Sequence, residues 1–268
     1  MKFIYLAGLC LFYYCTIGQS TYHFPGGACI QSLCGISVLP NGPEAVYLNP
    51  ASTTAIKAST SIDASGGQLP GLPTHIQPGL GILHKLKGST LGLSITKSGV
   101  SEFRYTQLGI SYARPLLKNL NLGLRFNGGA LRIKEYGSAY QMSCDVGFIG
   151  TINKISSLGF YISYPIITTA SNGLSLPIRM AVAYGYMPNN KTKLMIEIEK
   201  IEDREVSPKI GFVYLPLKTV EIRLSTDFMR TMAGWGVGYK LNNNTLFTSY
   251  TYHRDLGGIL GLSLQWLK

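Results

Sequence analysis

From about residue 58 to the C-terminus, apolar side chains recur at every second position, and short clusters of turn-forming residues interrupt the pattern. Between residues 191 and 201, for example, Leu194, Ile196 and Ile198 alternate with side chains that are mostly charged. A period of two is typical of a β-strand whose two faces meet different surroundings. No run of about 18 apolar residues follows the N-terminal region, so a multi-helix membrane protein is not expected. The chain is therefore predicted to be an all-β protein.

The alternating runs predict about fourteen strands, with twelve as the main alternative count. An even number is what single-chain bacterial barrels have. The predicted spans are Ala58–Ser65, Pro78–Leu86, Ser89–Lys97, Glu102–Arg114, Asn119–Lys134, Ser138–Ile152, Ser156–Pro165, Leu176–Met187, Lys191–Ile201, Val206–Leu215, Lys218–Phe228, Met232–Leu241, Asn244–His253 and Gly258–Leu267. The alternation slips at Gly128–Gly129, which predicts a β-bulge there.

A soluble sandwich buries the apolar faces of its strands and a membrane barrel presents them to lipid, so alternation alone fits both. Several features favour the barrel. The runs are about ten residues long, as a tilted membrane span requires. Only 14% of the residues are charged, against roughly 25% in a typical soluble domain. Aromatic residues recur near the predicted strand ends, as in an interfacial girdle: Tyr105, Tyr112, Tyr136, Tyr164, Tyr186, Tyr214, Tyr252 and Trp266. The predicted fold is thus a transmembrane antiparallel β-barrel over residues 58–268.

The N-terminus has the pattern of a secretory signal peptide. Met1-Lys2 supplies a short positive region, and Phe3 to Gly18 forms one apolar stretch. A single anchor helix is the alternative, although the stretch is short for a span. We expect residues 1–19 to be the signal peptide, with cleavage near Gly18 to Ser20. Together with the barrel, this predicts export to the outer membrane of a Gram-negative bacterium.

The formal net charge of +11 raises the question of a nucleic-acid partner. The basic residues are scattered, however, and many lie in predicted turns: Lys118, Lys154, Lys191, Lys193 and Lys218. An exported chain also has little access to nucleic acid. We therefore predict solvated turn charges, no nucleic-acid partner, and outer-membrane lipid as the surrounding medium.

Three cysteines follow the predicted signal peptide. Cys29 and Cys34 could form a small-loop disulfide in an oxidising compartment. Cys144 falls on an apolar strand face and is predicted to be a small buried or lipid-facing residue. No C-x-x-C pair is present, so neither a zinc ribbon nor a thioredoxin-like motif is expected.

Residues 20–57 do not alternate and are predicted to form a segment of their own before the barrel. Within it, the stretch Gly27 to Lys57 reads GACIQSLCGISVLPNGPEAVYLNPASTTAIK. It combines a Gly-Ala start, the turn Asn41 to Glu44, and the motif Tyr47-Leu48-Asn49-Pro50-Ala51. These features resemble the N-terminal signature of the long-chain fatty acid transporter superfamily of outer-membrane barrels. Asn-Pro also occurs in ordinary turns.

The C-terminal third is similar to small members of that superfamily from Bacteroidota-like bacteria, some of which accompany type IX protein secretion machinery. The likeness rests on Lys209 to Pro216, Gly234 to Tyr239 and Ser249 to Leu264. The resemblance implies fourteen strands and an N-terminal hatch that enters the barrel, with Tyr47, Asn49, Pro50 and Ala51 as the hatch motif.

The resemblance also implies passive passage of small hydrophobic molecules across the outer membrane. The alternative is a structural or partner-binding barrel attached to secretion machinery, because the predicted external loops are short. A bound hydrophobic ligand and a secretion-machinery protein are the corresponding partners.

The polar faces of several predicted strands carry charges of both signs, which are expected to point into the lumen. The candidate lumen-facing residues are Arg125, Asp145, Glu197, Glu199, Glu221, Arg223 and Asp227. They could line a polar path, or they could form a cross-strand network that holds a plug. Mixed signs argue against a simple ion-selective ring.

The sequence does not predict an enzyme. His253-Arg254-Asp255 resembles a kinase tripeptide, but no phosphate-binding loop accompanies it. No G-x-S-x-G, Walker A or H-E-x-x-H motif occurs. Gly234 to Gly238 alternates as a strand and is not read as a dinucleotide loop. We predict no catalytic residue, no cofactor and no metal site.

Overall fold

The computed structural model describes residues 27–40, 42–68, 76–168, 177–254 and 257–268. The predicted signal peptide and Asn41 lie outside these residues. Among the described residues, no helix is both long enough and apolar enough to cross a membrane.

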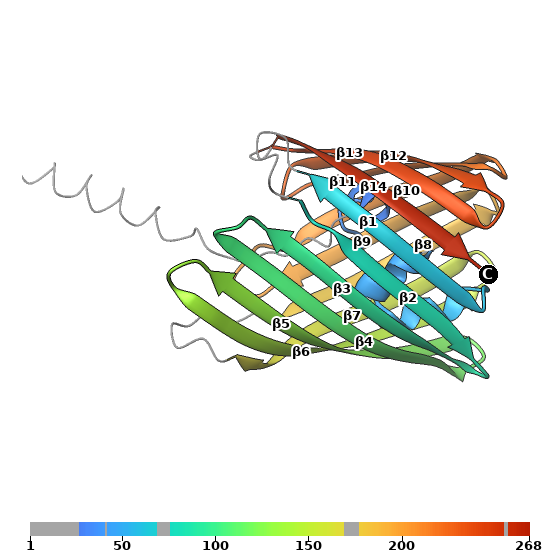
Figure 1. Ribbon diagram of the computed structural model, residues 1–268. Helices are drawn as coiled ribbons and strands as arrows, with labels where there is room; N and C mark the ends of the chain where they lie inside the picture. The colour runs from blue at the N-terminus through green and yellow to red at the C-terminus, as the bar shows by residue number, and fades with distance from the viewer. Residues whose placement is uncertain (1–26, 41, 69–75, 169–176, 255–256) are drawn as a thin grey trace, which may run out of the picture.

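Fourteen antiparallel strands form one closed barrel (Figure 1), as predicted, and the count of twelve is wrong. Each strand pairs with the next along the chain, and β1 closes the ring by pairing with β14. A single closed sheet also rules out the sandwich. The strands are β1 (Thr60–Gln68), β2 (Gly79–Leu86), β3 (Ser89–Gly99), β4 (Phe103–Leu117), β5 (Leu120–Ile133), β6 (Gly137–Asn153), β7 (Ser156–Thr168), β8 (Arg179–Asn189), β9 (Thr192–Ile201), β10 (Ser207–Leu217), β11 (Val220–Asp227), β12 (Met232–Leu241), β13 (Asn244–His253) and β14 (Gly257–Leu267).

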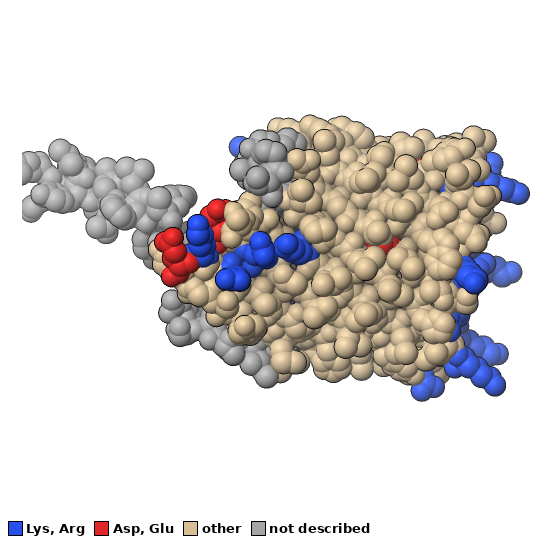
Figure 2. Space-filling model, viewed as in Figure 1, with Lys and Arg blue, Asp and Glu red and all other residues tan. Residues whose placement is uncertain are grey.

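The apolar face of each strand points away from the barrel axis. In β9, Leu194, Ile196 and Ile198 are 36%, 43% and 54% exposed, whereas Glu197 and Glu199 are fully buried. This is the reverse of a water-soluble protein, in which large apolar side chains are inside and charges outside. Figure 2 shows the result as a wide, almost uncharged wall with most of the visible charged residues at its two ends. A barrel with such a surface requires a lipid environment.

The lumen contains the segment that precedes the strands (Figure 1). It comprises α2 (Ala28–Gln31) and the 3₁₀ turns η1 (Pro43–Tyr47) and η2 (Pro50–Ala55). We call the described residues between 27 and 57 the inner segment. Because most inward-facing wall residues are small or polar, the inner segment supplies much of the apolar core.

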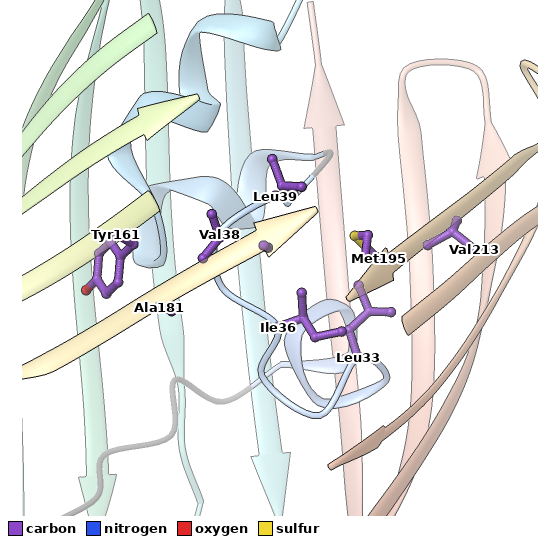
Figure 3. Close-up of a cluster of buried hydrophobic side chains, with 9 residues drawn as sticks. Leu33, Ile36, Val38, Leu39, Tyr161, Ala181, Met195 and Val213 are labelled. Carbon is purple, nitrogen blue, oxygen red and sulfur yellow. The ribbon is translucent and has the colours of Figure 1, made fainter. Parts of the chain in front are cut away.

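One apolar cluster joins the inner segment to β7, β8, β9 and β10 (Figure 3). Leu33, Ile36, Val38 and Leu39 come from the inner segment. The wall contributes Tyr161, Ala181, Ala183, Met195 and Val213. A second cluster packs Val46, Tyr47 and Leu48 against Leu83 of β2. Burial of these side chains by the hydrophobic effect favours retention of the segment inside the barrel.

The predicted bulge at Gly128–Gly129 is wrong. Gly128 pairs with Leu108 and Met142, and the register continues through Gly129 without a shift. The slip in the alternation is only apparent, because a glycine stands on the lipid-facing side and a leucine on the lumenal side. Gly128 faces outward, whereas Leu131 faces the lumen and is only 7% exposed. The register shifts lie elsewhere, at Pro115/Leu117, Met142/Ser143, Thr151/Asn153, Tyr186/Asn189 and Tyr214/Leu217.

One member of the predicted aromatic girdle is also misplaced. Tyr105 is 7% exposed and lies inside the barrel, where its hydroxyl accepts a hydrogen bond from Gln141 Nε2 at 2.6 Å. Its position in β4 has the parity of the lumenal face. By contrast, Tyr112, Tyr136 and Tyr164 are 43%, 88% and 53% exposed.

Candidate functional site

The contact between the inner segment and the barrel is built around a fully buried carboxylate on β9. Glu197 Oε2 accepts hydrogen bonds from the backbone amides of Ser37 at 2.7 Å and Val38 at 2.8 Å. Lys209 Nζ of β10 lies 3.3 Å from Glu197 Oε1 and 3.0 Å from Glu199 Oε2. All three charged side chains have no exposed surface. A buried charge is tolerated only with such partners.

Four buried cations on the wall donate to backbone carbonyls of the inner segment. Lys193 of β9 binds Leu39 O at 2.7 Å, and Lys209 binds Gly35 O at 3.3 Å. Arg223 of β11 binds Cys29 O at 2.9 Å, and Arg125 of β5 binds Val46 O at 2.7 Å. Gly35 and Leu39 lie outside the helical turns of the inner segment, so the two lysines satisfy carbonyls that have no partner within a helix. Cys29 and Val46 lie in short turns, and the Cys29 carbonyl also accepts a hydrogen bond from Ser32 Oγ at 3.3 Å.

Like Lys209, the two arginines also have carboxylate partners. Arg125 Nε donates to Asp145 Oδ2 at 2.7 Å. Arg223 Nη1 lies 3.1 Å from Glu44 Oε1, and its Nε lies 2.6 Å from Glu221 Oε1. The guanidinium of Arg223 also lies 4.6 Å from the centre of the Phe247 ring, which adds a cation–π contact.

A further ion network lies on β8 to β11. Glu199 pairs with Arg179 and with Arg230, the latter at 2.6 Å. Arg230 also contacts Asp227 at 3.2 Å, and Ser207 donates to Asp227 at 2.5 Å. Through Glu199, this network is continuous with Lys209 and Glu197.

All seven candidate lumen-facing residues have inward positions, but they do not converge on one site. Glu197, Glu199 and Asp227 belong to the network on β8 to β11. Arg223 and Glu221 form a second group, and Arg125 and Asp145 a third. Sequence reasoning missed four buried or half-buried members: Lys193, Lys209, Arg179 and Arg230. Inward parity along the strands was the available signal for Lys193, Lys209 and Arg179, and Lys193 was instead assigned to a solvated turn. Arg230 lies in the connection between β11 and β12, where strand parity gives no signal.

The motif residues lie at the entry to η2. Asn49 is fully buried; its Nδ2 donates to Val38 O at 2.9 Å and its Oδ1 accepts from the Ala51 amide at 3.0 Å. Asn49 is thus the N-cap of η2, and Pro50 occupies the first position of the turn, as the capping preferences favour. The Tyr47 hydroxyl donates to Asp63 O at 3.2 Å.

Glycines in the wall make room for this part of the inner segment. A Cβ at Gly123 would lie 2.8 Å from Ala51 Cα and closer still to Ala51 N. A Cβ at Gly147 would lie 2.8 Å from Asn49 Cγ. The backbone of the inner segment therefore lies very close to the wall here. Only glycine, which has no side chain, permits this spacing.

A cavity of about 220 Å³ lies between the inner segment and β10 to β14. Its lining includes Pro43, Lys218, Glu221, Arg223 and Phe247. The lining combines apolar surface with charges of both signs. Among the described residues, no group of three or more His, Cys, Asp or Glu is arranged to hold a metal ion.

Both cysteines of the inner segment are free thiols and are buried, so the disulfide considered from the sequence is not formed in the structure. Burial raises the pKa of the Cys34 thiol to about 11. Burial also raises the pKa of the Cys29 thiol well above its usual value, although the nearby Arg223 opposes the shift. The thiolate is the reactive form, so both thiols are expected to be inert while the segment stays in place.

Thiol labelling therefore reports whether the inner segment is in place. In the folded barrel at pH 8, the thiolate fraction of Cys34 is expected to be about 100-fold below that of an ordinary thiol. The labelling rate with a charged maleimide should rise about tenfold per pH unit towards pH 11. Mass spectrometry of the labelled peptides checks this, with the protein in guanidinium as the control in which both thiols react. Rapid labelling of folded protein at pH 8 would contradict the buried arrangement.

Comparison with known proteins supports the fold. No protein-family model matches the chain, and no curated protein matches it. Among solved structures, the Ralstonia pickettii toluene transporter TbuX is similar, with a TM-score of 0.69 at 10% identity over 92% of this chain and 100% of that chain. The Pseudomonas putida toluene transporter TodX has a TM-score of 0.67 at 10% identity, over 92% and 99% of the two chains. The monoaromatic hydrocarbon channel CymD has a TM-score of 0.65 at 10% identity, over 91% and 97%. The shared property at this identity is the fourteen-stranded fold.

Proposed function

We propose that this protein is an outer-membrane channel for the passive passage of small hydrophobic molecules. In this proposal, residues 1–19 direct export, residues 20–57 act as a hatch, and residues 58–268 form the transmembrane barrel. The observation that carries the proposal is a lipid-facing barrel whose lumen is occupied by a separate segment held through hydrogen bonds and ion pairs. Such contacts can be exchanged for water or ligand without dismantling the wall.

The fold likeness supports this choice of substrate class. The similar structures are described as a toluene transporter and as a monoaromatic hydrocarbon channel. This likeness supports the proposal that the chain belongs to the superfamily of fatty acid and hydrocarbon transporters. The apolar cluster around Val38, Tyr161 and Met195 is buried, so in this proposal it would meet a small apolar solute only after the inner segment had moved.

One observation favours the alternative of a closed, partner-binding barrel associated with secretion machinery. The inner segment is tightly fitted, because Asn49, Glu197 and Lys209 have no exposed surface and wall glycines touch its backbone. A plug fitted in this way could be permanent.

Uptake measurements separate the two functions. The gene would be expressed in a Gram-negative host that lacks its own hydrocarbon channels, and initial uptake of radiolabelled toluene would be compared with uptake of a charged solute of similar size. A channel for hydrophobic molecules should raise toluene uptake several-fold and leave the charged solute unchanged. Unchanged toluene uptake with correctly assembled barrel, together with a stoichiometric protein partner in native mass spectrometry, would favour the partner-binding role.

A reversible cross-link tests the hatch separately from transport. A Cβ at Gly159 would lie 2.4 Å from Val38 Cγ1, a clash that Val38→Cys reduces by removing one methyl group, so combining Val38→Cys with Gly159→Cys should bring two thiols close together. If the segment must move, oxidation should reduce toluene uptake to the host background and reduction should restore it. The two single-cysteine variants are the matched controls. Uptake that persists after oxidation would reject the hatch while leaving the channel role intact.

A further inference from the structure

The two ends of the barrel differ in charge. One end consists of the six short turns at residues 87–88, 118–119, 154–155, 190–191, 218–219 and 242–243, together with the C-terminus. We call this end the short-turn rim. Figure 2 shows only basic side chains at this end, and both signs at the opposite end.

Five of the six turns contain an exposed lysine, and an exposed lysine lies two residues before the sixth turn. These are Lys87, Lys118, Lys154, Lys191, Lys218 and Lys240. Lys57, Arg114 and the C-terminal Lys268 add to the same rim and are also exposed. Among the described residues of this rim the one acidic side chain is Glu221, which points into the cavity and pairs with Arg223. The rim is thus a nearly uniform positive ring.

The opposite rim shows that this pattern is not a general property of the chain. There, Glu102, Glu135, Glu202, Asp203 and Glu205 are interspersed with Arg104, Arg132, Lys134 and Arg204. Charges of both signs at that end can neutralise one another locally. Among the residues that the structure describes, the acidic side chain near the lysines of the short-turn rim is the partly exposed Glu221, which is already paired with Arg223.

The lysines border directly on the lipid-facing band. Leu86, Leu117 and Leu217 are 41%, 67% and 62% exposed, and each is followed at once by a rim lysine. Leu241, next to Lys240, is 60% exposed. A side chain at this level has its stem beside acyl chains and its ammonium group at the level of the lipid phosphates.

We propose that the short-turn rim is a collar that binds anionic phospholipid headgroups in the leaflet at this end of the barrel. The positive charge runs around the whole circumference, at one level, at the edge of the apolar band. A layer of lipid phosphates surrounds the barrel at one level in the same way, whereas a docked protein would contact a basic patch on one side. Each lysine near an anionic membrane surface adds to the attraction between the protein and the membrane, and salt weakens this attraction by screening. The collar would set the depth and orientation of the barrel, independently of what the lumen transports.

Native mass spectrometry of the full barrel in a mild non-ionic detergent tests the proposal. The protein would be titrated with phosphatidylglycerol and, separately, with zwitterionic phosphatidylethanolamine. We expect tighter binding of phosphatidylglycerol, and an affinity about tenfold lower after Lys87→Gln, Lys118→Gln, Lys154→Gln and Lys191→Gln are combined. Binding of phosphatidylethanolamine should not change. Heat-modifiable gel mobility verifies that the variant is folded.

The matched control removes four exposed cations at or near the opposite rim, including Lys97 close to the far end of β3: Lys97→Gln, Arg104→Gln, Arg132→Gln and Lys134→Gln. This control should retain the preference for phosphatidylglycerol. Equal binding of the two lipids by the unmodified protein, or an equal loss in both variants, would overturn the proposal. Displacement of the lipid by millimolar inorganic phosphate would assign the site to a free anion. If the short-turn variant lost an acidic protein partner but kept the lipid preference, the collar would be a protein-docking surface instead.

Discussion

The substitution Glu197→Ala is expected to lower the free energy of unfolding by about 3–5 kcal/mol, because it breaks a buried ion pair and leaves two buried amides without their acceptor. The amides of Ser37 and Val38 lose the carboxylate oxygen that accepts from them, and Lys209 keeps Glu199 as its carboxylate partner. Unfolding in urea, followed by tryptophan fluorescence in phospholipid vesicles, measures the loss. The inner segment should also loosen, so Cys34 should label faster at pH 8 than in the unmodified barrel.

The control for this substitution is Glu205→Ala, which removes an exposed carboxylate from the connection between β9 and β10. Exposed changes of this kind are usually within about 0.5 kcal/mol. The loss of stability for Glu197→Gln should lie between those of Glu197→Ala and Glu205→Ala, since the amide oxygen can still accept one hydrogen bond. A loss below about 1 kcal/mol for Glu197→Ala would show that packing, and not this carboxylate, retains the segment.

The wall of the barrel was predictable because its information is local. Alternation marks each strand, and turn residues mark each boundary, so β9 was predicted as Lys191–Ile201 and is observed as Thr192–Ile201. The inward direction of Glu197 and Glu199 follows from the same parity. Where the local pattern was ambiguous, the prediction failed: an aromatic residue near a strand end can belong to the girdle or to the lumen, and Tyr105 belongs to the lumen.

The partners of the lumenal charges were not predictable from local pattern. Glu197 and Ser37 are 160 residues apart in the sequence, and Arg223 and Cys29 are 194 apart. Their contact depends on closure of the barrel and on the depth at which the inner segment lies. The alternating pattern of the sequence specifies neither the closure of the barrel nor the depth of the inner segment. For the same reason, Lys209 could not be recognised as the counter-charge of two carboxylates, although its parity placed it inside.

The substitution Gly123→Ala is expected to displace η2 from the wall and to lower the free energy of unfolding by about 3 kcal/mol, since overpacking against backbone cannot be relieved by a side-chain rotation. The new Cβ would lie 2.8 Å from Ala51 Cα and closer to Ala51 N. The neighbouring Asn49 cap would be strained as well, because its side chain is confined by Gly147 on β6. Urea unfolding measures the stability, and planar-bilayer conductance measures whether the lumen opens.

Gly128→Ala is the matched control, on the same strand and with the same change in volume. Gly128 faces outward and a Cβ there would meet nothing within 4 Å. It should leave both stability and conductance close to those of the unmodified barrel. The comparison separates two contributions to retention of the inner segment. If Gly123→Ala opens the lumen while the barrel stays assembled, close backbone fit at η2 is required to close it. If Gly123→Ala behaves like Gly128→Ala, the ion pairs on β9 and β10 suffice, and the fit at η2 is dispensable.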